Sequence, residues 1–341
     1  VYGFNLVYSG NHYESVEKSP FGKVRFLSGI NPTSFEWKLS KGESFLTPEA
    51  VMTYSSMGYN GMSGQMHDFV SKHILRGPWK DRLRPVLLNS WEASYFKISE
   101  SKLLRLARKA KEAGIELFVM DDGWFGERND DTTSLGDWFP DTRKLPRGVK
   151  GICDKVRALG LDFGIWVEPE MVNRESGLYL AHPEWAMEIP GKNHSEGRNQ
   201  MVLDLANVEV QDHLIKVMSK VFSSANISYV KWDMNRNFSD IFLRSLPADR
   251  QGVCLCREHC VVSEYEALRF GAFAGEAFNA CNKTQLACEA VDCVLGCLVE
   301  FRSVAECRSG RIESASLDFY LVRVGDYVDR VSSTLLASNG Q

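Results

Sequence analysis

Asp233 is the residue of this chain best placed to carry out a reaction. It directly follows the largely apolar run Ile227 to Trp232, where a strand would end and a loop begin. Lys231 precedes it by two residues, so in a strand both side chains would point to the same side of the sheet. A cation there would keep the carboxylate ionised and nucleophilic at neutral pH. The spacing alone suits a structural ion pair equally well.

Polar and aromatic residues also follow the other apolar runs of the chain. In a (β/α)8 barrel the carboxyl ends of the strands converge on one mouth, where such barrels place their chemistry. Carboxylates and tryptophans, without a histidine cluster or a Ser-His-Asp set, indicate sugar chemistry, because aromatic rings pack on the apolar face of a pyranose and carboxylates bind its hydroxyls. The strand-end residues are Asn89 to Glu92, Asp121 to Trp124, Glu168 to Glu170, Asp204, and Asp233 to Arg236.

Strands and helices alternate between residues 81 and 252. Continuous apolar runs predict strands buried on both faces at 86–89, 117–120, 163–167, 201–203 and 229–232. Helices are predicted near 149–159 and 208–222, and a further helix is predicted between a cap at Ser99 or Ser101 and a stop at Gly114. These five βα units indicate an α/β fold, a TIM-type (β/α)8 barrel that is incomplete in this chain. A doubly wound sheet would normally show a Gly-rich turn after its first strand, and none is present.

The first 80 residues have a different pattern. They are rich in Ser, Gly, Tyr and Thr, and short stretches such as Val24–Leu27 and Ser34–Leu39 predict antiparallel strands joined by tight turns. We interpret residues 1–80 as the end of an N-terminal β-sandwich domain. The first residues already have the character of the middle of a domain, so we expect that an upstream portion is missing.

Charge and composition exclude several classes of protein. A net charge of -4 and a pI near 6.0 provide no basic field for nucleic acid. No apolar run approaches the roughly 20 residues that span a bilayer, and no export signal is visible, so we expect a cytoplasmic protein without a membrane partner. No metal or cofactor is expected, because no phosphate loop occurs and no metal-ligand spacing links His12, His67, His73, His182 and His194.

Several motifs resemble those of a known family. LFVMDDGW (Leu117–Trp124), IWVEPEM (Ile165–Met171), YVKWDMNR (Tyr229–Arg236) and the stretch Arg84 to Glu92 are similar, in order and spacing, to the α-galactosidases of glycoside hydrolase family 36. The resemblance covers about residues 1–252. It implies an N-terminal β-supersandwich domain, a catalytic (β/α)8 barrel, and hydrolysis of terminal α-galactosides with retention of configuration. It also implies a homo-oligomer for a full-length relative.

The resemblance further implies roles for individual residues. Asp233 matches the catalytic nucleophile, and Trp166 matches an aromatic wall of the sugar subsite, for which Trp91 is a second candidate. The adjacent pair after residue 120 matches the carboxylates that bind galactose hydroxyls. The substrate-binding positions implied in this way are Asp121, Asp122, Trp166, Arg198, Lys231 and Asn235.

Each of these assignments has a simpler alternative. Adjacent carboxylates such as Asp121 and Asp122 usually mark a solvated turn, and Arg198 can be read as an ordinary surface residue. Glu168 and Glu170 resemble a catalytic pair, but their alternation places both on one side of a strand end. We therefore expect structural roles for these two glutamates.

The resemblance ends after about residue 252. The family carries its general acid/base beyond the sixth strand, and the corresponding motifs are absent, so no acid/base is identified. Eight of the nine cysteines lie between Cys254 and Cys307. This tail, residues 253–341, is interpreted as a frameshifted sequence, as a module with disulfides, or as a zinc site at Cys254, Cys256, His259 and Cys260. Glu313 is a poor match for the missing acid.

The sequence therefore predicts a truncated retaining α-galactosidase for oligosaccharides such as melibiose and raffinose. Its activity should be weak, because general-acid assistance contributes about 10² to 10⁴ in rate. An α-N-acetylgalactosaminidase or a galactosyl transferase on the same scaffold is the nearest alternative. A non-catalytic sugar-binding remnant and a Cys-rich metal-binding protein belong to other classes.

Overall fold

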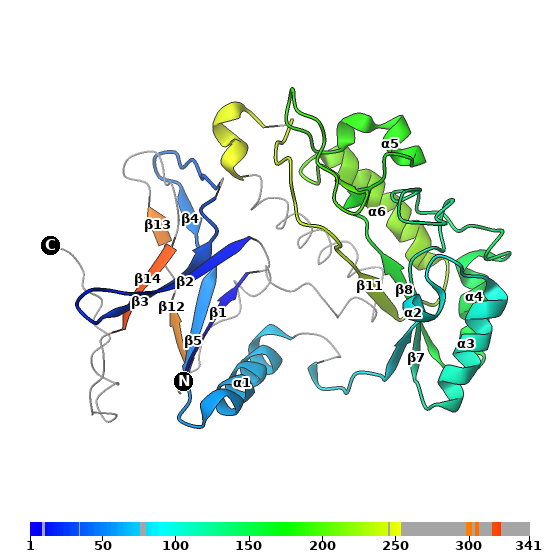
Figure 1. Ribbon diagram of the computed structural model, residues 1–341, viewed down its shortest axis with the longest axis horizontal. Coiled ribbons are helices and arrows are strands. Elements are labelled where there is room, and N and C mark those ends of the chain that lie inside the picture. Colours follow the sequence, from blue (N-terminus) through cyan, green and yellow to red (C-terminus); the bar gives the residue numbers. More distant parts are fainter. Residues whose placement is uncertain are drawn as a thin grey trace.

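The computed structural model describes residues 1–8, 11–33, 35–75, 80–244 and 246–253, and the backbone of three short strands between residues 298 and 321. Antiparallel strands, most of them from the start of the chain, form one part of the molecule, and a parallel sheet with its helices forms the other (Figure 1). The candidate residues for chemistry all belong to the second part.

The N-terminal part is built from antiparallel strands, as predicted for residues 1–80. One sheet has the order β1-β5-β12, a second has the order β14-β3-β2, and β4 pairs with β13. Helix α1 (Gly58–Phe69) and the turn η1 (Val70–Ile74) follow these strands. The strands are β1 (Tyr2–Val7), β2 (His12–Lys18), β3 (Val24–Ile30), β4 (Ser44–Leu46), β5 (Glu49–Tyr54), β12 (Leu298–Phe301), β13 (Val304–Glu306) and β14 (Ser316–Leu321).

The strand expected at Ser34–Leu39 does not form. Residues 35–39 lie outside the named strands, and the side chains of Phe35 and Leu39 pack with Ile30 and Phe45 in a small core. The alternation of apolar and polar residues there reflects anchoring of a loop on this core, because a loop also buries some side chains and exposes others.

Four strands form a parallel sheet in the second part. Their order is β11-β8-β7-β6, with β6 at Leu87–Asn89, β7 at Leu117–Met120, β8 at Asp162–Val167 and β11 at Tyr229–Trp232. Every residue of β7 and five of the six residues of β8 are buried. This burial explains the continuous apolar runs, because a parallel strand covered by helices has no solvated face.

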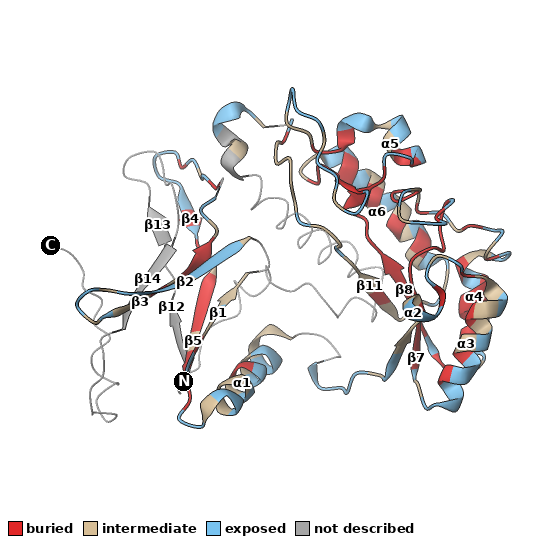
Figure 2. Ribbon diagram, in the orientation of Figure 1, coloured by how far each residue is buried: buried red, intermediate tan, exposed pale blue. Residues whose placement is uncertain are grey.

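Helices connect successive strands of this sheet, which confirms the α/β class. Helix α3 (Glu100–Glu112) begins where the Ser99 side chain accepts a hydrogen bond from the Lys102 N–H, and Gly114, with a φ of 82°, follows its end. Buried residues line the inner faces of α3, α4 (Gly148–Arg157) and α6 (Val208–Ser223), as Figure 2 shows. The shorter turns and helices are α2 (Trp91–Ser94), α5 (Gly177–Ala181), η3 (Pro183–Trp185) and η4 (Ala248–Val253).

The prediction of a sheet strand at 201–203 is wrong. Strand β10 (Met201–Val202) instead pairs antiparallel with β9 (Met171–Val172), and β11 pairs directly with β8. The described residues therefore contain four parallel strands, not five. Met201 and Leu203 are apolar because they belong to a second core with Val172 and Trp185. An apolar run alone does not tell which core a segment enters.

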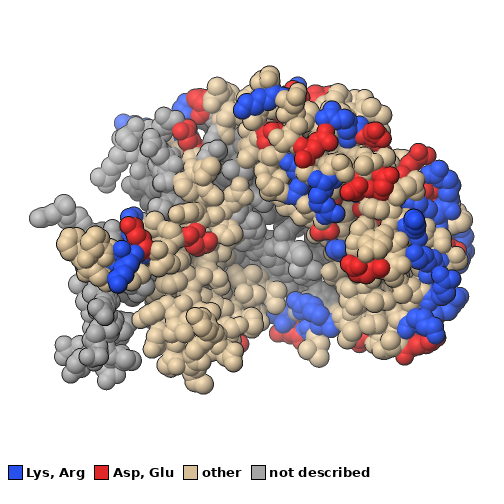
Figure 3. Space-filling model, in the orientation of Figure 1, with Lys and Arg blue, Asp and Glu red and all other residues tan. Residues whose placement is uncertain are grey.

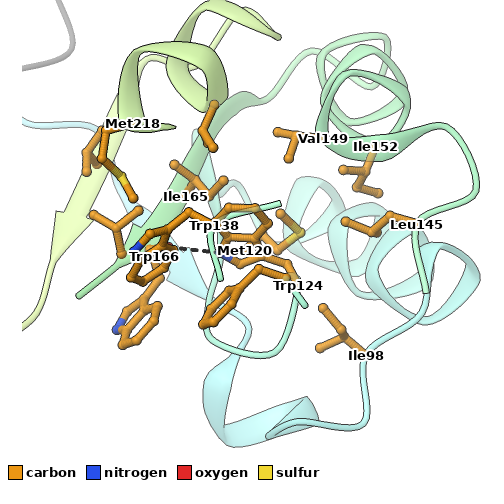
Figure 4. Close-up of a cluster of buried hydrophobic side chains, with 14 of the residues drawn as sticks. Ile98, Met120, Trp124, Trp138, Leu145, Val149, Ile152, Ile165, Trp166 and Met218 are labelled. Carbon is orange, nitrogen blue, oxygen red and sulfur yellow. Dashed lines mark hydrogen bonds between the residues drawn. The ribbon is translucent and has the colours of Figure 1, made fainter. Parts of the chain in front are cut away.

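The main core lies between the sheet and its helices and is rich in tryptophan. Trp124, Trp138 and Trp166 lie together beside Met120 (Figure 4), and the Trp124 Nε1–H donates to the Trp166 carbonyl at 2.9 Å. This contact joins the loop after β7 to strand β8. The core thereby fixes the positions of two strand ends that carry candidate site residues.

The predictions for the tail fall mainly outside the described residues. This holds for the zinc ligands proposed at Cys254, Cys256, His259 and Cys260, and for Glu313. The three strands described in this region, β12, β13 and β14, pair with β5, β4 and β3 of the N-terminal part.

Candidate functional site

The carboxyl ends of the four parallel strands bring the candidate residues together around Lys231. The Lys231 Nζ lies 3.0 Å from Asp121 Oδ2 and 3.7 Å from Asp233 Oδ2. The Asn89 amide, from the end of β6, also donates to Asp121 Oδ2. Strand β8 lies between β7 and β11, so the Lys231 side chain reaches across the end of one intervening strand to contact Asp121.

Asp233 is held as an ionised carboxylate. Its Oδ2 accepts a hydrogen bond from Trp166 Nε1 at 2.9 Å, and its Oδ1 accepts one from the Met234 N–H at 3.1 Å. Burial would raise the pKa of Asp233, but donation by Trp166 and the positive charge of Lys231 lower it overall. The side chain is still 30% exposed, so a ligand can reach it.

Lys231 keeps its positive charge beside these two carboxylates. Burial would lower the pKa of Lys231, but its hydrogen bond to Asp121 and the charges of Asp121 and Asp233 raise it overall. The sequence alone left open whether Lys231 and Asp233 form only a structural ion pair. In the structure Lys231 lies closer to Asp121 than to Asp233. It therefore interacts with carboxylates at the ends of two strands, β7 and β11, and not with Asp233 alone.

The adjacent pair Asp121 and Asp122 is buried, with only 3% and 5% of each residue exposed, so the alternative of a solvated turn is wrong. The two carboxylates have separate cationic partners. Asp121 pairs with Lys231, whereas Asp122 binds Arg128 in a two-pronged contact, with Nε to Oδ1 at 3.1 Å and Nη2 to Oδ2 at 3.0 Å. Burial raises the pKa of Asp122, and the charge of Arg128 opposes that rise.

Glu168 and Glu170 are engaged by neighbouring protein groups. Glu168 is fully buried and accepts the Asn235 N–H at 2.6 Å and the Gln200 amide at 3.0 Å. Glu170 accepts a hydrogen bond from Trp232 Nε1. Burial raises the pKa of Glu168, although the Asn235 donor acts in the opposite direction. These contacts tie Glu168 to the loop that carries Asp233, as expected of a supporting group.

Arg198 reaches the same site from a tight turn. Arg198 and Asn199 have φ values of 53° and 59°, and backbone hydrogen bonds between Gly197 and Gln200 close the turn. The Arg198 Nη1 donates to Asn235 Oδ1. Two predicted substrate-binding residues therefore touch, and Arg198 is not an unattached surface side chain.

Trp91, the second aromatic candidate, lies close to the site through its backbone. The Trp91 N–H donates to Asn89 Oδ1 at 2.7 Å, and Asn89 in turn donates to Asp121. Its ring meets Tyr95 and Phe96 edge-on.

Sequence reasoning missed Arg128. Its side chain is 1% exposed and serves Asp122, yet it lies in a loop without a motif or a periodic pattern. A buried carboxylate requires a nearby cation, and that requirement was the one signal that could have directed attention to Arg128.

Two further observations concern ligand classes. Among the described residues no three His, Cys, Asp or Glu side chains gather where a metal ion could bind, and none of the helices described is long and apolar enough to cross a membrane. Acidic and basic side chains both occur over the helical part of the face seen in Figure 3.

Two family profiles match the chain. The melibiase profile matches residues 44–282, and the profile of the glycosyl hydrolase family 36 N-terminal domain matches residues 1–40. The resemblance inferred from the motifs is thereby confirmed, and the melibiase match continues past residue 252, where the motifs end.

Characterised relatives and solved structures give the same assignment. The chain is 53% identical over 251 residues to α-galactosidase AgaA of Geobacillus stearothermophilus and 49% identical to α-galactosidase Mel36A of Lactobacillus acidophilus, covering 74% of this chain and 34% of each relative. A crystal structure of AgaA superposes with a TM-score of 0.77 at 49% identity, over 80% of this chain and 38% of AgaA. The chain thus spans about a third of the length of these relatives. It belongs to the melibiase family, the α-galactosidases of glycosyl hydrolase family 36.

Proposed function

We propose that this chain carries the nucleophile half of a retaining α-galactosidase, with Asp233 as the nucleophile. One observation supports this most strongly. Asp233 is ionised and accessible at a strand end, with Trp166 donating to it and Lys231 3.7 Å away. We further propose that β6, β7, β8 and β11 are the first four strands of a (β/α)8 barrel, which their parallel pairing and the helices between them support.

In the proposed reaction the Asp233 carboxylate attacks the anomeric carbon of a terminal α-galactoside. A bond forms between Asp233 and that carbon, the glycosidic C–O bond breaks, and the leaving oxygen takes a proton from a general acid. Water then attacks the galactosyl-enzyme and gives a proton back to the group that acted as the acid. The bond to Asp233 breaks, its carboxylate leaves, and two inversions give net retention.

Two carboxyl groups close to Asp233 are poorly suited to the role of that acid. Glu168 has both oxygens engaged by protein donors, and Asp121 accepts from Asn89, from Lys231 and from the Asp122 N–H. Groups held by donors are poorly placed to give a proton to a leaving oxygen. We therefore assign the acid to neither Glu168 nor Asp121.

The sugar-binding roles belong to the same proposal. Carboxylates such as Asp121 and Asp122 would accept hydrogen bonds from galactose hydroxyls, and Lys231 would donate to them. Arg198, on the turn before β10, and Asn235, in the loop after β11, would bind other hydroxyls. Trp166, which matches the aromatic wall of the family, is only 2% exposed, so it would act mainly through the Nε1–H that it donates to Asp233. Solved structures of AgaA include complexes with raffinose and with stachyose, which supports α-galactosyl oligosaccharides as the substrate class.

The test compares p-nitrophenyl α-galactoside hydrolysis by the 341-residue chain and by its Asp233→Asn variant. The nitrophenolate leaving group needs little acid assistance, so the assay isolates the nucleophile. We expect turnover that disappears in Asp233→Asn and persists in the control Asp162→Asn, which removes an exposed carboxylate at the opposite end of β8. Equal turnover by the Asp233 variant would contradict the proposal.

A sugar-binding protein without turnover is the second candidate. It is favoured by one observation, that the carboxyl oxygens of Glu168 and Asp121 are already engaged by protein donors. In the same assay it would give no turnover from either protein, together with measurable binding of D-galactose.

A further inference from the structure

Arg128 forms the centre of a buried polar network that reaches beyond Asp122. Its guanidinium donates to both oxygens of Asp122, to the Thr133 carbonyl at 2.9 Å and to Asn173 Oδ1 at 2.8 Å. The side chain is only 1% exposed. A buried ion pair of this kind is stabilising only when further hydrogen bonds satisfy the remaining donors, and here Asn173 and Thr133 accept them.

Asn173 extends the network to a different loop. It is fully buried, and its Oδ1 accepts from Arg128 and from the Leu135 N–H at 2.9 Å. Its amide nitrogen donates to the Asn199 carbonyl and, at 3.2 Å, to the Asp131 carbonyl. One amide group therefore joins the loop after β7 to the turn before β10.

That turn is the one that carries Arg198. A positive φ at two successive non-glycine residues costs on the order of 1 kcal/mol for each, so the turn needs support from its surroundings. The hydrogen bond from Asn173 to the Asn199 carbonyl supplies part of it. Arg198, one residue earlier, contacts Asn235 from this position.

We propose that Arg128 and Asn173 are positioning residues that hold the Asp122 carboxylate and the Arg198 turn at a fixed separation. We call the chain of hydrogen bonds from Asp122 through Arg128 and Asn173 to the Asn199 carbonyl the bridge. On the proposed function, the bridge sets the distance between the residues that bind galactose on the two sides of the site. Neither residue is required to touch the sugar. Arg128 acts through Asp122, and Asn173 acts through the Asn199 backbone.

Hydrogen exchange measured by mass spectrometry tests the bridge without a ligand. Asn173→Ala keeps the Arg128–Asp122 pair but cuts the link to the turn. We expect peptides spanning Gly197 to Met201 to exchange up to about tenfold faster, since a hydrogen bond contributes roughly 0.5 to 1.5 kcal/mol. Arg157→Met, which removes an Arg–Asp pair at the other end of the sheet, should leave those peptides unchanged. Unchanged exchange there in Asn173→Ala would overturn the bridge.

D-galactose affinity measured at several pH values then distinguishes a specific effect of Arg128 on Asp122 from a general loss of structure in the variant. The charged groups near Asp122 are Arg128, Asp121 and Lys144. Without Arg128, burial of Asp122 loses its largest opposing influence and only the Gly123 N–H still acts against it, so the pKa of Asp122 rises further. The carboxylate is then lost on acidification at a pH where the parent chain retains it. We therefore expect D-galactose affinity of Arg128→Met to fall about tenfold per pH unit below that new pKa. Arg128→Lys should restore much of the pH-independent binding.

The two proposals fail in different ways. An Arg128→Met variant that binds D-galactose as tightly as the parent chain at every pH, measured by tryptophan fluorescence with D-glucose as the control sugar, would contradict the positioning role. A parent chain that binds no D-galactose would contradict the proposed function, and the exchange of the Gly197 to Met201 peptides would still decide whether the bridge exists.

Discussion

The loops after β7 and after β11 both carry aspartates to the same site, yet they hold them in opposite ways. The side chains of Asp121 and Asp122 are 4% and 7% exposed, and Asp122 is locked to the buried Arg128. Asp233 is 30% exposed and has its nearest cation at 3.7 Å. One loop is built into the core, whereas the other presents its carboxylate to solvent.

The proposed roles would divide binding and reaction between these two loops. A carboxylate that accepts sugar hydroxyls works best when its position is fixed before the ligand arrives, because no ordering is then needed on binding. A nucleophile must approach and leave the anomeric carbon, and it needs an open path to do so. The structure provides the first condition at Asp122 and the second at Asp233.

Matched substitutions give the largest expected difference between the two loops. Asp122→Asn leaves the Arg128 charge buried beside a neutral amide, which should lower the free energy of unfolding by about 3 to 5 kcal/mol. Asp233→Asn breaks a partly exposed pair and should lower it by about 1 kcal/mol or less. Urea unfolding followed by tryptophan fluorescence measures both. Equal losses would show that the loops do not differ as described.

A smaller effect is expected from the donor that Asp233 receives from β8. Trp166→Phe removes the Nε1–H, so the pKa of Asp233 should rise. Since only the ionised carboxylate attacks, hydrolysis of p-nitrophenyl α-galactoside should be lost at a higher pH on acidification than in the parent chain. Trp232→Phe is the matched control, because Trp232 donates to Glu170. An acid limb displaced equally in both variants would refute a specific role for Trp166.

The sequence was sufficient to predict which residues meet at the site. Asp121 and Asp233 each follow an apolar run, Lys231 lies two residues before Asp233 in the second run, and parallel strands bring their carboxyl ends to one edge. The positions of the Ser99 cap and of Gly114 after α3 were equally predictable, because capping depends on local residue chemistry.

Features that depend on tertiary contacts were not predictable in this way. The apolar segment at β10 reads like a sheet strand, because burial in a second core requires the same residue types. Arg128 has its partner six residues away in an irregular loop, and its link to Asn199 passes through Asn173. No periodicity marks such contacts, so only the folded structure reveals them.

The most direct test of the account is to trap the covalent intermediate. 5-Fluoro-α-D-galactosyl fluoride combines a leaving group that needs little acid assistance with a substituent that slows release of the sugar from the enzyme. Peptide mass spectrometry of the treated 341-residue chain should find the galactosyl group on Asp233, within the peptide Val230 to Arg236. A label on another carboxylate, such as Asp121 or Glu168, or binding of the reagent without any label, would contradict the assignment of Asp233 as the nucleophile.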